Sequence, residues 1–351
     1  MPTPAMRPNF AATIMAAVPY RDMDRTARII LSHFPEAPCL PVMTRGIRWS
    51  LEGIPCVVID RQKKSIYLDA SPEREEELLE FYDRYEQDDL DYFATTRQTA
   101  PFFHDMIEAI RTARPPEIKW LVFHSAGPVL LGDIIKQPDG RPAMHHETLR
   151  DMLIKACSMK ARWLERKIKT EVPGVEVVAD LPETTLINFT SSGGTGSRES
   201  IVEAIDQGFS GLNCTTMIHC CANIDWSLLT ETTVDVINFD AYAHSENASL
   251  YARQFKAFLD RGGMIAWGIV PVQEELLRRE SVSSLVERLE RGIEMFVRQG
   301  IDEETLAASS WIIPSCETVL LTEDDSDRVF GMTREISEIM REKYGLSGSK
   351  G

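Results

Sequence analysis

Long apolar runs and a surplus of basic residues are both missing from this 351-residue chain. No run reaches the roughly 18 residues that a membrane span requires, and the first 20 residues lack the apolar core of a signal peptide. The 54 acidic residues outnumber the 38 basic ones and leave a formal charge of −16, whereas nucleic-acid binding normally shows as a basic face. We therefore expect a cytoplasmic protein with no membrane or nucleic-acid partner.

Cysteines are few, odd in number and irregularly spaced, and no C-x-x-C pair is present. These features argue against a disulfide framework and against a redox pair of the thioredoxin kind. They leave free, buried, catalytic or metal-bound thiols as the alternatives. The seven residues are Cys39, Cys56, Cys157, Cys214, Cys220, Cys221 and Cys316.

The composition is that of a globular protein with a substantial core, because 43% of the residues are hydrophobic and 26% are charged. Most of the acid falls in segments such as 71–91, which we interpret as a solvated helix surface. From about residue 115 onward, short β-branched runs alternate with long amphipathic segments, of which 145–172 and 281–300 are examples. Such alternation predicts parallel strands joined by right-handed helical crossovers. The predicted strands are 10–16, 38–43, 119–125, 175–181, 211–220, 234–240, 264–270 and 310–316.

Eight strand–helix units in about 350 residues favour an α/β protein built as a (β/α)8 TIM barrel over an open sheet. The stretch "IPCVVIDRQKKSIYLDAS" predicts a β-hairpin inserted after the second strand, with its turn near Gln62 to Lys64. We expect residues 1–345 to form a single barrel domain and residues 346–351 to be a disordered tail.

In a barrel the chemistry lies at the carboxyl ends of the strands, and the stretch "IHCCANIDW" ends one of them. Side chains alternate along a strand, so His219 and Cys221 point to one side and Cys220 to the other. Cys316 follows the last strand and would supply a second thiolate. Imidazole and thiolates are zinc ligands, and three protein ligands with one open position are typical of catalytic zinc. Asp240 is the expected fourth ligand, with His244 and Glu317 as alternatives.

These residues also carry a family resemblance. "HCCAN", "DVINFDAY", "GGMIAWGIVP" and "IPSC" together resemble the superfamily of the cobalamin-independent methionine synthase catalytic barrel. That superfamily also holds the methylcobalamin:coenzyme M methyltransferases and uroporphyrinogen decarboxylase. The resemblance implies zinc held by His219, Cys221 and Cys316, with Asp240 as the fourth ligand, in a methyltransferase of the methionine synthase kind. The zinc would bind the thiol of the methyl acceptor, such as homocysteine.

The acceptor site departs from the family pattern. "VVADLP" resembles the family's Asp-Glu-Pro, in which the aspartate helps to hold the amino group of homocysteine. Asp180 matches that catalytic position, but Leu181 replaces the glutamate. Ala17 stands where a serine contributes to acceptor binding, and Glu317 stands where glycine is usual. These departures point to a different acceptor thiol.

The length of the chain leaves room for one barrel, whereas the cobalamin-independent enzyme has two. We therefore expect a methylcorrinoid such as methylcobalamin, on a partner corrinoid protein, to be the methyl donor rather than methyl-tetrahydrofolate. Two alternatives stay open at this point: a metal-free barrel of the uroporphyrinogen decarboxylase type, and a corrinoid- or small-molecule-binding barrel without catalysis.

Other residues are candidates for lining the substrate pocket. His124 ends the third strand in "FHSAGPVLLG", and Tyr242 and Trp267 lie near strand ends, as does Trp226. The glycine-rich segment 190–200 lacks the lysine of a phosphate-binding P-loop. We interpret that segment as a loop over the barrel mouth.

Overall fold

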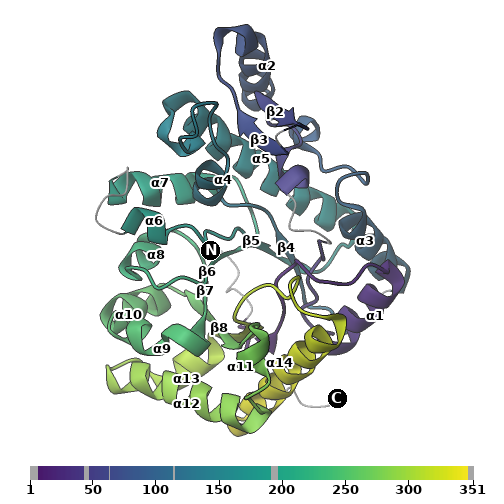
Figure 1. Cartoon of the computed structure of the whole chain (residues 1–351). Helices are drawn as coiled ribbons and strands as arrows, with labels where there is room; N and C mark the ends of the chain where they lie inside the picture. Colours follow the sequence, from purple (N-terminus) through teal and green to yellow (C-terminus); the bar gives the residue numbers. More distant parts are fainter. Residues whose placement is uncertain (1–6, 43–46, 63, 114, 191–196, 347–351) are drawn as a thin grey trace.

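A parallel β-sheet curls around a filled interior in the computed structural model, which describes residues 7–42, 47–62, 64–113, 115–190 and 197–346. Within these residues the sheet has seven strands in the order β1-β9-β8-β7-β6-β5-β4, and every neighbouring pair is parallel. The helices surround the sheet (Figure 1). The strands are β1 (Ala11–Ala12), β4 (Trp120–His124), β5 (Glu176–Asp180), β6 (Thr215–Cys220), β7 (Val236–Phe239), β8 (Met264–Val270) and β9 (Ser310–Pro314).

The two edges of this sheet are joined through residues 38–42, the predicted second strand. Cys39 bridges to Val122 of β4, and Val42 bridges to Ala17 after β1, both in parallel. Only isolated bridges form here because Pro38 and Pro41 have no N–H to donate to a strand ladder. The structure is thus TIM-like, as predicted, but its second strand is shorter than predicted. The last predicted residue of that strand, at position 43, lies outside the described part.

The interior of the barrel is packed with side chains. The rings of Trp120 on β4 and Trp311 on β9 lie 4.9 Å apart between their centroids, although these strands are not neighbours in the sheet. The contact therefore crosses the interior, and residues in register with these two tryptophans also face inward. Because both tryptophans lie at or near the start of their strands, they fill the lower part of the barrel. The upper part is left for polar groups.

The helices that cover the sheet follow the predicted pattern. The long amphipathic segments become α5 and α12, and the apolar stripe of α12 is buried at Leu285, Leu289 and Ile293. No helix among the described residues is long and apolar enough to cross a membrane. The helices are α1 (Met23–His33), α2 (Glu75–Glu86), α3 (Pro101–Ala113), α4 (Pro128–Ile134), α5 (Glu147–Glu171), α6 (Ile187–Thr190), α7 (Arg198–Gly208), α8 (Ser227–Glu231), α9 (Ala241–Ser249), α10 (Ala252–Asp260), α11 (Glu274–Leu277), α12 (Val282–Arg298), α13 (Glu303–Ala308) and α14 (Glu323–Lys343).

The predicted β-hairpin is present and extends from the barrel together with α2 (Figure 1). Strands β2 (Val57–Asp60) and β3 (Ser65–Leu68) pair antiparallel. A second apolar cluster joins this hairpin region, α2 and the 3-10 helix η3 (Leu90–Phe93) to α4 and α5. A buried cation lies beside this cluster: Lys160 of α5 is only 2% exposed. Its Nζ donates to the carbonyl of Phe93 at 3.0 Å and lies 3.4 Å from Oγ1 of Thr95.

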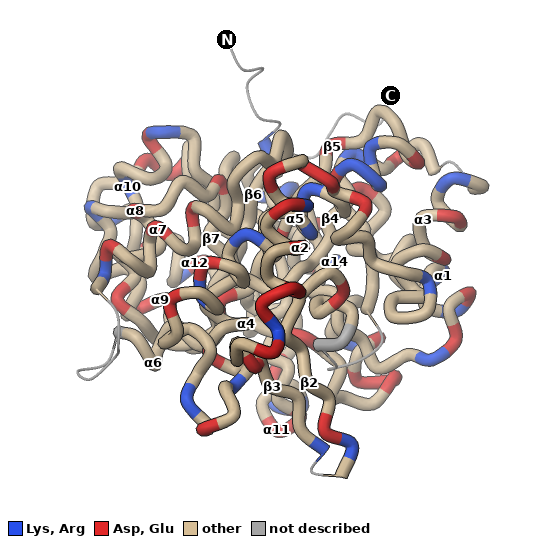
Figure 2. Tube along the Cα trace, turned by 90° about the horizontal axis from the view of Figure 1, so that it is seen from above, with Lys and Arg blue, Asp and Glu red and all other residues tan. Residues whose placement is uncertain are grey.

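The surface carries both signs of charge. Seen from above, acidic and basic positions are interspersed around the molecule and no broad basic face is visible in this view (Figure 2). The predicted acidic helix surface is α2, whose only buried residue is Phe81. The predicted tail from 346 onward lies outside the described residues except for Leu346, and so does most of the glycine-rich loop, including Gly193, Gly194 and Gly196.

Candidate metal centre at the mouth of the barrel

Four polar side chains line the interior near the carboxyl ends of neighbouring strands. In the sheet register His124 pairs with Asp180, Asp180 with Met217, and His219 with Asn238. Side chains alternate along a strand, so His124 faces inward like Trp120, four residues before it. Register partners share a face, so Asp180 on β5 also faces inward. The same holds for His219 on β6 and Asn238 on β7. All four are buried, with exposed fractions of 7% or less. The parallel sheet therefore collects them in one place.

His219, Cys221 and Cys316 form the predicted cluster. One ligand atom from each residue lies within 4.8 Å of the others. In a tetrahedral zinc site adjacent ligand atoms are separated by about 3.5–3.8 Å, given bond lengths near 2.0 and 2.3 Å, so a small contraction would complete the geometry. Cys220 is fully buried in the apolar core, which confirms that it points away from its neighbours.

The buried imidazole of His219 is suited to bind a metal ion. Its exposed fraction is 0%, and neither ring nitrogen makes a well-aligned hydrogen bond with the described residues. Buried polar atoms are normally satisfied, so these nitrogens fit a bound cation on one side and a hydrogen-bond partner on the other. Both cysteines are only half buried, which leaves a side of the cluster open, as in catalytic rather than structural zinc sites.

The two thiols and the imidazole are electrostatically coupled. A hydrogen bond from Cys316 lowers the pKa of the Cys221 thiol, and the same contact together with burial raises the pKa of Cys316. Burial alone would lower the pKa of His219, but its contact with Cys316 outweighs that effect and raises it, with further contributions from Asp180 and Asn238. The cluster thus already favours a thiolate at Cys221, the form that binds metal.

Asp240 is not part of this group of three. Its carboxylate caps α9 by accepting a hydrogen bond from the backbone N–H of Ala243 at 2.9 Å, and burial raises its pKa. Its role as a fourth ligand stays a prediction, as do the alternatives His244 and Glu317.

His124 and Asp180 form a buried pair beside the cluster. His124 Nε2 lies 2.8 Å from Asp180 Oδ2, without the alignment of a hydrogen bond, so the contact is an ion pair. On the other side of the ring, Nδ1 lies 3.5 Å from Sγ of Cys39. Burial lowers the pKa of His124, but the attraction of Asp180 and Cys39 outweighs it and raises that pKa well above its usual value.

The two predicted aromatic residues have partners of their own. Trp267 pairs in register with Phe239, one position away from the inward-facing Asn238, so it lies on the outer face of the sheet. There its ring packs 5.5 Å from Phe296 of α12, and its Nε1 donates to Ser310 at 2.9 Å. Tyr242 donates from its hydroxyl to Glu280 at 2.8 Å, with Arg288 stacked 4.2 Å above its ring. Trp267 therefore faces the helices rather than the barrel interior, and a substrate contact of Tyr242 stays a prediction.

Sequence reasoning missed two buried residues next to the site. Glu183 accepts hydrogen bonds from the backbone N–H groups of Val129 and Leu130 at the start of α4, and burial raises its pKa to about 8. Its own N–H donates to the carbonyl of His219 at 2.8 Å. Asn238 was not singled out either, although the two-residue period of its strand would have placed it beside His219.

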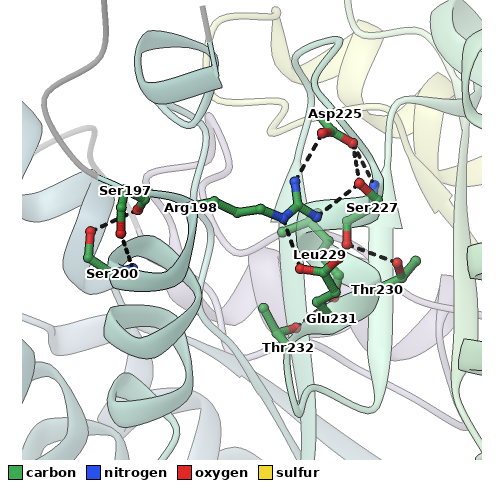
Figure 3. A network of polar contacts seen from close by, with 9 residues as sticks. All are labelled: Ser197, Arg198, Ser200, Asp225, Ser227, Leu229, Thr230, Glu231 and Thr232. Atoms are coloured by element: carbon green, nitrogen blue, oxygen red, sulfur yellow. Dashed lines mark hydrogen bonds and ion pairs between the residues drawn. The ribbon is translucent and has the colours of Figure 1, made fainter.

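An arginine network holds the loop that follows the two strand-end ligands. Arg198, at the start of α7, contacts Asp225 and Ser227 at 2.9 Å and Glu231 at 2.8 Å (Figure 3). These three partners lie in or beside α8, directly after the segment that carries Cys221. A groove of about 670 Å³ runs along α7 and is lined in part by Arg198 and Glu231 of this network, but its lining includes none of the cluster residues.

Comparisons with known proteins give structural matches of low score and no sequence match. No family model and no curated protein sequence matches the chain. Among solved structures, the chain is similar to a B12-independent methionine synthase from Shewanella sp. W3-18-1 in complex with selenomethionine, with 14% identity and a TM-score of 0.47, over 68% of this chain and 67% of that one. An uncharacterised protein and an amidohydrolase each match with 12% identity, over 70% of this chain and 61% and 62% of theirs, with TM-scores of 0.31 and 0.30. The chain itself has a TIM-like barrel with a His-Cys-Cys cluster that can bind a metal ion.

Proposed function

We propose that this protein is a zinc-dependent methyltransferase that moves a methyl group from a methylcorrinoid to a thiol. The observation that carries the proposal is the convergence of His219, Cys221 and Cys316 at the open end of the barrel, with an imidazole whose ring nitrogens lack aligned partners. A hydrolytic zinc site more often uses nitrogen and oxygen ligands, whereas two cysteines leave the ion with little net positive charge.

The roles of the residues follow from their positions. His219, Cys221 and Cys316 would hold the ion, and Asn238 would fix the orientation of the imidazole. Bound zinc would lower the pKa of an acceptor thiol so that its nucleophilic thiolate forms near neutral pH. The half-buried side of the cluster is where the acceptor would enter, and the barrel wall would hold it in line with the donor. In the proposed reaction the acceptor sulfur would form a bond to the methyl carbon, the electron pair of the broken bond would stay with the donor, and the thiol proton would leave to solvent.

The first experiment is metal analysis and zinc-edge X-ray absorption on protein purified without added metal. We expect about one zinc per chain, with sulfur and nitrogen neighbours. A Cys316→Ala variant should lose one sulfur neighbour, whereas Cys157→Ala, a buried thiol on α5 away from the cluster, should lose none.

The second experiment tests methyl transfer itself. Zinc-loaded protein, methylcobalamin and a panel of thiols should give a methyl thioether, and the Cys316→Ala variant should give none. Methyl-tetrahydrofolate in place of methylcobalamin tests the donor. The absence of zinc even after reconstitution would refute the proposal and return the metal-free decarboxylase type of barrel to consideration.

A further inference from the structure

The pair of His124 and Asp180 bears on which thiol this site accepts, an inference that rests on the proposed function. Both residues face the barrel interior as register partners on β4 and β5. Their side chains are 5% and 0% exposed, so the carboxylate is fully enclosed, and one of its oxygens lies 2.8 Å from Nε2 of the imidazole. On the opposite side of the ring, Nδ1 lies 3.5 Å from the Cys39 sulfur, so the ring is held between two partners.

This pair lies next to the metal cluster. Asp180 on β5 pairs with Met217 on β6. His219 follows Met217 by two residues on β6 and therefore lies on the same face of the sheet. Diagonal neighbours of this kind lie roughly 7–8 Å apart. An acceptor bound through its sulfur at the cluster would reach the pair with a chain of a few carbons.

Charge balance at the pair decides what the far end of such an acceptor can be. At the inward-facing positions of the described strands β4 to β9, no lysine or arginine is present. His124 is therefore the group that faces Asp180 at 2.8 Å, and this contact raises the pKa of the imidazole well above its usual value, which favours the charged form. An ammonium group brought here would meet an enclosed carboxylate that already has a cationic partner, and it would be repelled by the imidazolium in contact with that carboxylate.

We propose that the acceptor of this site is a thiol that carries a carboxylate and lacks an amino group, because His124 occupies Asp180 and presents the only accessible charge of the pair. A carboxylate at the far end of the acceptor would approach the imidazolium, with which it can form a charge-assisted hydrogen bond. An α-amino thiol would have to displace His124 from Asp180 before its ammonium could bind.

A matched pair of thiols tests this directly. Homocysteine and 4-mercaptobutanoate differ only in the α-amino group. Zinc-loaded full-length protein is titrated with each thiol by calorimetry, and zinc-edge absorption confirms that each adds one sulfur neighbour. We expect 4-mercaptobutanoate to bind about tenfold or more tightly than homocysteine, since charge–charge contacts at this range are worth at least one factor of ten. Homocysteine binding as tightly or more tightly would overturn the inference while leaving the proposed function intact.

Two variants identify the residues responsible. His124→Gln removes the cation and frees Asp180, so homocysteine should gain about tenfold in affinity and 4-mercaptobutanoate should lose affinity. His104→Gln is the control, because His104 is also partly buried and contacts a carbonyl oxygen, that of Thr95, at 2.8 Å, and it should change neither thiol. In Asp180→Asn the affinity for homocysteine should not fall. A loss of tenfold or more there would show that Asp180 binds the ammonium, and would refute the proposal even if the His124 variant did not fold. If no zinc or thiol binds at all, the proposed function fails before this question is reached.

Discussion

The buried lysine of α5 leads to a prediction that can be worked out in sign and size. Burial lowers the pKa of Lys160 from its ordinary 10.5 to about 8. In the unfolded chain the same side chain stays protonated up to about pH 10.5. Between pH 8 and 10.5 the unfolded state therefore binds more protons, and the contribution of this group to stability rises with pH. Below pH 8 the folded protein carries the buried charge, and the desolvation of that charge lowers its stability by the full amount.

The size follows from the two pKa values. At about 1.36 kcal/mol per pH unit, the difference between 10.5 and about 8 corresponds to roughly 3 kcal/mol at neutral pH. By pH 9.5 about 2 kcal/mol of that is recovered. Lys160→Met removes the titration but leaves the carbonyl of Phe93 without its donor, which costs about 1–3 kcal/mol at every pH. The difference in stability between wild type and variant should therefore shift by about 2 kcal/mol in favour of wild type between pH 7 and pH 9.5.

Urea unfolding of both proteins at the two pH values measures this shift, and the comparison cancels the titration of every other group. Lys155→Met is the control, since Lys155 lies on the same helix but pairs with Asp151 near the surface, and its difference from wild type should stay nearly constant. A Lys160→Met difference that does not change with pH would refute the reasoning, because it would mean that Lys160 is as well solvated in the folded protein as in the unfolded chain.

Three further outcomes are expected. Asn238→Leu should weaken zinc binding about 10–100-fold, because the imidazole loses the neighbour that orients it, and chelator competition would measure this; unchanged affinity would contradict that role. Gly127→Ala should cost about 1–3 kcal/mol because a Cβ there would lie 2.3 Å from Oε1 of Glu183. Gly331→Ala, inside α14, should gain about 0.5–1 kcal/mol, because a Cβ there would lie 3.9 Å from Cε1 of His33, an ordinary van der Waals distance; equal unfolding midpoints for the two would disprove the steric argument. Removing zinc should lower the free energy of unfolding by about 2.7 kcal/mol relative to protein kept in free zinc at 100 times the dissociation constant. The free energy of unfolding of Cys316→Ser should not depend on zinc in this way.

Much of the fold could be predicted because the hydrophobic periods of the sequence are regular. The apolar spacing of four along α12 and the β-branched runs of β4 to β9 are strong patterns. The apolar pattern overestimates the length of the second strand, because the prolines at positions 38 and 41 cannot donate to a strand ladder.

The metal cluster could be predicted from His219, Cys221 and Cys316 since each ends a strand of a barrel. Trp267 was harder to place because its face depends on the register of its strand, and one residue of offset turns a side chain from the interior to the helices. The pairing of His124 with Asp180 and Cys39 depends on contacts between separate strands, which no local pattern contains. Glu183 lies in the loop after β5. The contacts of a loop residue depend on the path of the backbone and not on a hydrophobic periodicity in the sequence.

The joining of the first and last strands constrains the order of events during synthesis. The strand pairing of β1 with β9, and the hydrogen bond from Ser337 to the carbonyl of Phe10, link residues as far as 327 positions apart. Contacts at such separations form late and slowly. Since Cys316 follows β9, a nascent chain would offer only His219 and Cys221 until the ribosome has released nearly the whole barrel. A cell would therefore load metal into this protein only after folding is nearly finished, and an incomplete chain would have no complete site with which to take up zinc.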